Sequence, residues 1–181
     1  MKLKLLLLVL ALQTAWILGT TFVQERTLAG GQVVLLETRP VDPRDLLRGD
    51  YVTLGYKISD VPFDLFSPAL TNGLAPGETV YVALEPRGQF HEVALASTNR
   101  ITPAAGQVVL KGHTRSWWNS AAQRSLRLEY GLERYYVREG TGNPRGTITV
   151  QAAVPDSGQA QIKAVFVDGK PYKEAMKGVA R

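Results

Sequence analysis

The chain has 181 residues, a formal net charge of +5, no cysteine and only two histidines. A disulfide framework and a thiol nucleophile are therefore excluded. With His91 and His113 as its only histidines and no cysteine, the chain is also unlike a protein with a dedicated zinc site. Without Lys2 and Lys4, nineteen basic side chains face sixteen acidic ones. That excess is too small to indicate a nucleic-acid partner.

An almost unbroken apolar run at residues 5–23 follows a short N-terminus that carries Lys2 and Lys4. As a helix the run would be roughly 29 Å long, which matches the hydrocarbon core of a bilayer. We therefore predict a transmembrane anchor at 5–23, with residues 1–4 in the cytoplasm because positive charge favours that side. A cleaved signal peptide with its apolar region at 5–12 is the alternative, although no Ala-x-Ala-like site follows it.

Residues 24–31 are the expected flexible linker, and residues 32–181 the extracytoplasmic domain. From residue 32 onward, short segments rich in Val, Leu, Ile, Thr and Tyr alternate with Gly, Pro, Asn and Asp. This pattern predicts a mainly β fold: a single barrel-like or sandwich domain of about nine short antiparallel strands. The expected strands are 32–37, 51–59, 79–85, 90–97, 107–114, 125–130, 134–137, 147–153 and 160–167. Hairpin turns are expected at 86–88 and 155–158.

The octapeptide Gly49-Asp50-Tyr51-Val52-Thr53-Leu54-Gly55-Tyr56 joins a turn dipeptide to an alternating strand. Alternation places Tyr56 on the face that we expect to be buried and Tyr51 on the opposite face, near Asp50. The Asp50 carboxylate could be a purely structural group that pairs with Arg39, Arg44 or Arg48, or it could belong to a binding site.

The octapeptide matches the signature of the GDYXXLXY family of bacterial membrane-anchored proteins at every specified position. The block at 130–142 resembles a second recurrent segment of that family. The resemblance implies a single-pass protein of the bacterial cytoplasmic (inner) membrane, with a β-rich domain in the periplasmic or envelope space outside it. It implies no established activity.

We predict a non-catalytic binding or accessory domain that contacts a membrane or envelope partner. An integral membrane protein is one possible partner. The candidate binding residues are Arg48, Asp50, Tyr51, Tyr56, Arg134 and Tyr135. The sequence contains no nucleophile motif, metal cluster or cofactor signature, so we assign no catalytic residue, metal or cofactor.

The alternative function is an envelope hydrolase in which Asp50 forms a carboxylate pair with Asp42, Asp45 or Glu133. Such a pair must lie about 5 to 9.5 Å apart with one pKa raised, and sequence spacing does not determine that distance.

Overall fold

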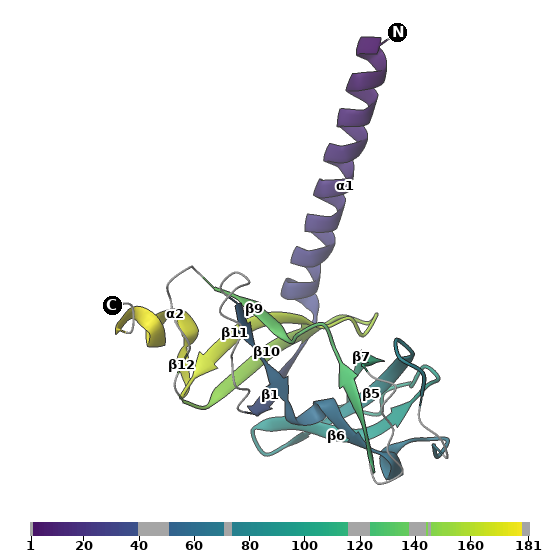
Figure 1. Ribbon diagram of the computed structural model, residues 1–181, viewed down its shortest axis with the longest axis vertical. Coiled ribbons are helices and arrows are strands. Elements are labelled where there is room, and N and C mark those ends of the chain that lie inside the picture. The colour runs from purple at the N-terminus through teal and green to yellow at the C-terminus, as the bar shows by residue number, and fades with distance from the viewer. Residues whose placement is uncertain are drawn as a thin grey trace.

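The computed structural model describes residues 2–39, 51–70, 74–115, 124–137, 144 and 146–178. A long N-terminal helix projects from a β-domain (Figure 1). The predicted mainly β fold with one apolar N-terminal helix is therefore confirmed.

Helix α1 (Lys2–Gly30) contains a stretch, Leu3–Gly30, that is long and apolar enough to cross a membrane. It continues through most of the segment 24–31 that we expected to be a flexible linker. The reason is local: residues 24–29 contain no proline or glycine. The last helical hydrogen bond runs from the Gly31 amide to the Thr27 carbonyl at 2.9 Å, and a Cβ on Gly31 would lie 2.6 Å from that oxygen, so glycine fits this close approach.

Twelve strand segments make up the sheets of the described residues. They are β1 (Gln32–Arg39), β2 (Tyr51–Thr53), β3 (Gly55–Tyr56), β4 (Asp60–Pro62), β5 (Thr79–Arg87), β6 (Phe90–Ser97), β7 (Val108–Thr114), β8 (Ser125–Glu129), β9 (Arg134–Tyr136), β10 (Ile148–Val154), β11 (Gln161–Val167) and β12 (Lys170–Pro171). Short helical turns are η1 (Lys57–Ser59), η2 (Phe63–Leu65), α2 (Tyr172–Ala175) and η3 (Met176–Gly178).

One five-stranded sheet has the order β12-β11-β10-β1-β3, and a second has the order β4-β8-β7-β5-β6. Strands β2 and β9 form a separate two-stranded ribbon. Every ladder between these strands is antiparallel, and the described strands do not close into a barrel. Of the two predicted architectures, the sandwich-like one fits.

Both predicted hairpins are present: β5 pairs with β6, and β10 pairs with β11. The single strand expected at 51–59 is instead divided into β2, β3 and η1. The division follows from pairing, because β2 pairs with β9, β3 with β1, and the following β4 with β8. This stretch of chain therefore connects the ribbon with both large sheets.

The inward face predicted for the octapeptide strand is confirmed. Val52, Leu54, Tyr56 and Ile58 are all buried, although they belong to different elements. They join one continuous hydrophobic core with side chains from both five-stranded sheets, such as Leu36 of β1. Every second side chain from Val52 to Ile58 thus still points into the core, although the backbone is not one continuous strand.

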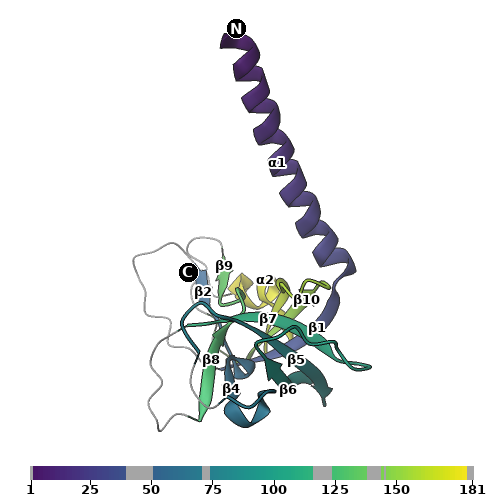
Figure 2. The same ribbon diagram turned by 90° about the vertical axis from the view of Figure 1, so that its right-hand side faces the viewer.

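Two views at right angles show where the ribbon lies relative to the helix (Figures 1 and 2). Strand β9 and helix α2 lie at the end of the β-domain from which α1 leaves, whereas β4 and β6 lie toward the far end.

Candidate functional site

The two segments that the sequence singled out are neighbours in space. In the β2–β9 ribbon, Tyr51 lies opposite Tyr136, Val52 opposite Tyr135, and Thr53 opposite Arg134. The ladder extends beyond the strands, because the Leu54 amide donates to the Glu133 carbonyl at 2.8 Å. The described parts of the octapeptide and of the second segment, residues 51–56 and 130–137, therefore form one structural unit.

Two buried tyrosines hold this unit to the core. The Tyr56 hydroxyl donates to the Leu132 carbonyl at 2.7 Å, and the Tyr130 hydroxyl donates to the Ile58 carbonyl at 2.7 Å. Burial raises the pKa of both tyrosines well above the ordinary value, and the negative charge of Glu133 adds to the effect. Both hydroxyls are therefore protonated donors at neutral pH, as their carbonyl partners require.

The outward face of the ribbon carries Tyr51, Arg134 and Tyr136, which we call the ribbon face. The Arg134 guanidinium lies over the Tyr51 ring, 5.6 Å from its centroid, and the Tyr51 and Tyr136 centroids are 6.1 Å apart. Tyr136 is 75% exposed. An aromatic ring this exposed and held beside a stacked arginine is a typical centre of a binding surface.

Tyr135 lies on the opposite face of the ribbon. Its ring meets that of Tyr172 in α2 edge-on, with the centroids 5.3 Å apart. Tyr172 itself is buried, so the contact fixes the ribbon against the C-terminal helix.

Of the predicted binding residues, the structure brings Tyr51 and Arg134 into direct contact. It places Tyr56 in the core and Tyr135 beneath the ribbon. Arg48 and Asp50 lie outside the described residues. The prediction omitted Tyr136, although strand alternation from Arg134 would have put the two side chains on the same face.

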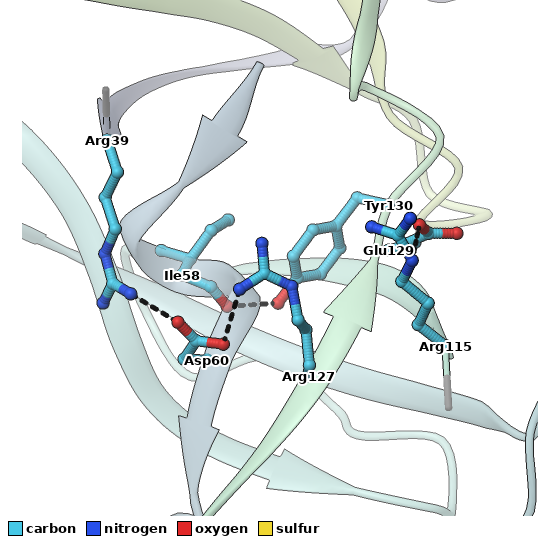
Figure 3. A network of polar contacts seen from close by, with 7 residues as sticks. All are labelled: Arg39, Ile58, Asp60, Arg115, Arg127, Glu129 and Tyr130. Atoms are coloured by element: carbon cyan, nitrogen blue, oxygen red, sulfur yellow. Dashed lines mark hydrogen bonds and ion pairs between the residues drawn. The ribbon is translucent and has the colours of Figure 1, made fainter. Parts of the chain in front are cut away.

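A network of charged side chains from β1, β4, β8 and the end of β7 lies beside this unit (Figure 3). Asp60 accepts hydrogen bonds from Arg39 and from Arg127, the latter at 3.2 Å, and Arg115 pairs with Glu129 at 3.1 Å. Asp60 lies directly opposite Arg127 in the β4–β8 ladder. Arg39, which we considered as a partner for Asp50, is thus bound to Asp60.

The hydrolase alternative depends on carboxylates that are mostly outside the described residues, namely Asp42, Asp45 and Asp50. Glu133 is described, and its Oε1 accepts a hydrogen bond from the Tyr130 amide at 2.6 Å. Glu133 therefore has a local structural role. Among the described residues, no group of three or more His, Asp or Glu side chains is placed to hold a metal ion.

The fold and the ribbon define a protein with one apolar N-terminal helix, a sandwich-like β-domain and a tyrosine–arginine surface at the helix end of that domain. The chain belongs to the GDYXXLXY family: the family described as GDYXXLXY protein matches residues 13–165. The match runs from α1 into β11 and includes both strands of the ribbon. Comparisons with curated proteins and with solved structures gave no match.

Proposed function

We propose that this protein is a membrane-anchored, non-catalytic binding or accessory domain whose ribbon face contacts an integral membrane protein. The observation that carries the proposal is the exposure of Tyr136 beside the stacked pair of Arg134 and Tyr51. Tyrosine and arginine are the residue types that contribute most to binding energy at protein interfaces.

Contacts within the domain hold the ribbon face in place before any partner binds. Its backbone is fixed by the β2–β9 ladder, and the rings of Tyr51 and Tyr135 each have an aromatic or cationic neighbour. A preordered surface loses less conformational entropy on association, so a small patch can bind with useful affinity.

The apolar helix and the position of the ribbon support a partner in the same membrane. A tether raises the effective concentration of such a partner, so even weak contacts would be populated. Lys2 and Lys4 favour a cytoplasmic N-terminus, which would place the β-domain in the extracytoplasmic space of a bacterial envelope.

Site-specific photocrosslinking in the native membrane tests this proposal. A benzophenone amino acid replaces Tyr136 in the full chain, and a control chain carries it at Gln89, an exposed position in the turn between β5 and β6. We expect a discrete adduct with an integral membrane protein from position 136 alone, and its loss in an Arg134→Glu background.

Failure to form an adduct at position 136, or the same adducts from both positions, would contradict the proposal. Both chains must first show the same yield in the membrane fraction, so that a difference reflects contact rather than expression.

A further inference from the structure

We propose that the β-domain rests on anionic phospholipid headgroups of the bilayer that α1 spans, through a C-terminal lysine face formed by Lys170, Lys173 and Lys177. All three side chains are exposed. This contact is additional to the protein contact of the ribbon face, and it uses different side chains.

Helix α1 sets the height of the domain above the membrane. The last residue of its apolar run is Val23, and the seven residues Gln24 to Gly30 continue the helix, which adds about 10 Å. The headgroup region on each side of a bilayer is about 5 to 8 Å deep. The near end of the domain is therefore close enough for long, flexible lysine side chains to reach the headgroups.

Lys173 belongs to α2 and Lys177 to η3 directly after it, and Lys170 belongs to the short strand β12 that leads into α2. Helix α2 is at the end of the domain from which α1 departs in both views (Figures 1 and 2). The exposed large hydrophobic side chains of the described β-domain are Val33 and Tyr136. Val33 follows α1 by three residues, and Tyr136 belongs to β9, so exposed apolar surface is also found at the near end.

Packing fixes the direction of the lysines. Tyr172 and Met176 are buried, and Tyr172 also meets Tyr135 of the ribbon. Because these two anchors turn one side of the C-terminal segment toward the core, Lys173 and Lys177, each one residue after an anchor, point away from that side and are exposed.

Acidic side chains near the lysine face reduce its positive electrostatic potential but do not cancel it. Asp168 and Glu174 are the acidic residues of the described segment 168–178, which also holds the three lysines. The Asp168 carboxylate already accepts a hydrogen bond from the Thr147 amide at 2.8 Å. The remaining excess is positive, which matches a surface of anionic headgroups.

Because α1 tethers the domain to the bilayer, this small excess of positive charge is enough to hold the lysine face against anionic headgroups. Each lysine near an anionic surface strengthens attachment by roughly fivefold, and the domain cannot diffuse away from the bilayer to which α1 holds it. The contact should therefore respond to lipid charge and to salt.

The absence of cysteine from the chain permits a direct test. A nitroxide is attached to the single cysteine of the full-length Lys173→Cys chain, which keeps Lys170 and Lys177. The chain is reconstituted into vesicles of phosphatidylcholine alone or with 30% phosphatidylglycerol. Power saturation then measures the collision of the nitroxide with a water-soluble nickel complex, and a Gln89→Cys chain, labelled in the exposed turn between β5 and β6, provides the control.

We expect collision at position 173 to fall about fivefold in the anionic vesicles and to recover in 0.5 M salt or with Lys170→Gln and Lys177→Gln. Position 89 should not change. Equal collision in both lipids at position 173, or an equal fall at position 89, would overturn the proposal. The vesicles contain no other protein, so this result is independent of the crosslinking test of the ribbon face.

Discussion

Tyr56 and Tyr130 form a reciprocal pair of hydrogen bonds, in which each hydroxyl donates to a backbone carbonyl two residues beyond the other tyrosine. Tyr56 bonds to Leu132, and Tyr130 bonds to Ile58. The last tyrosine of the octapeptide thus has a counterpart in the second segment, and the two together join segments that lie far apart in the sequence.

Removal of either hydroxyl should destabilise the fold. We expect Tyr56→Phe and Tyr130→Phe each to lower the free energy of unfolding by about 1 to 3 kcal/mol, because a buried carbonyl loses its donor. Urea unfolding of the full chain in detergent micelles, followed by near-ultraviolet circular dichroism, measures this. Tyr136→Phe is the control, since its ring is exposed, and an equal loss from Tyr136→Phe would contradict the assignment.

The same two tyrosines predict sensitivity to alkaline pH. Burial raises the pKa of Tyr56 and Tyr130 in the folded state, whereas an unfolded tyrosine ionises near pH 10. Below about pH 10 the tyrosines are neutral in both states and their contribution is fully present. Above it only the unfolded state releases the protons, so stability falls as pH rises, by roughly 1.4 kcal/mol per pH unit for each tyrosine.

Unfolding measured from pH 8 to pH 11.5 tests this dependence. The variant with both tyrosines changed to Phe should be less stable at pH 8 but should lose stability more slowly above pH 10. Ionisation of other groups affects both proteins alike, so only the difference in slope is diagnostic. Parallel slopes would show that these hydroxyls are not the buried groups responsible.

The Asp60 network should contribute modestly and should depend on salt. Asp60 retains 22% side-chain exposure, and its partners Arg39 and Arg127 are about half exposed. Exposed ion pairs contribute up to about 1 kcal/mol each, so we expect Asp60→Asn to cost less than about 2 kcal/mol. The loss should shrink in 0.5 M salt, because salt screens the pairs in the parent protein. A loss that is unchanged by salt would indicate a packing role instead.

His91 connects the two large sheets through a single hydrogen bond. Its Nδ1 accepts from the Leu35 amide of β1 at 3.2 Å, although His91 itself belongs to β6. We expect His91→Phe to lower the free energy of unfolding by about 1 to 2 kcal/mol, because a partly buried amide loses its acceptor. His91→Asn offers a side-chain oxygen near the same position and should recover part of the loss. Equal losses from both variants would argue against the hydrogen bond.

The sequence predicted the elements whose pattern is local. Strand β6 has the predicted bounds 90–97, and both hairpins follow from turn residues beside alternating strands. The division of residues 51–62 among the partner strands β9, β1 and β8 could not be predicted, because strand pairing is a non-local choice that alternation does not encode. For the same reason the contact between Arg134 and Tyr51 requires the β2–β9 register, even though each residue was singled out separately.

The linker prediction shows a different limit. Ala29, Gly30 and Gly31 indicated a flexible join, yet the residues before Gly30 are compatible with a helix and simply continue α1. Glycines at the end of a segment mark where a helix stops and say little about the residues before them.

Adjacent tyrosines on β9 allow folding and binding to be separated. Tyr135 packs against Tyr172 beneath the ribbon, whereas Tyr136 is the exposed ring on its outer face. We expect Tyr135→Ser to lower the free energy of unfolding by about 1 to 3 kcal/mol, because it leaves a gap between β9 and α2. Tyr136→Ser should change stability by less than about 0.5 kcal/mol, since an exposed ring has little packing to lose.

The two variants should rank the other way in binding, with Tyr136→Ser losing more adduct than Tyr135→Ser. With the photoreactive residue placed at Tyr51, on the same face, Tyr136→Ser should abolish the membrane-protein adduct although the domain is fully folded. Unfolding curves and adduct yields measured on the same two preparations check both halves of this prediction. An adduct that survives Tyr136→Ser but is lost in Tyr135→Ser would mean that the partner recognises the intact fold and not the exposed ring.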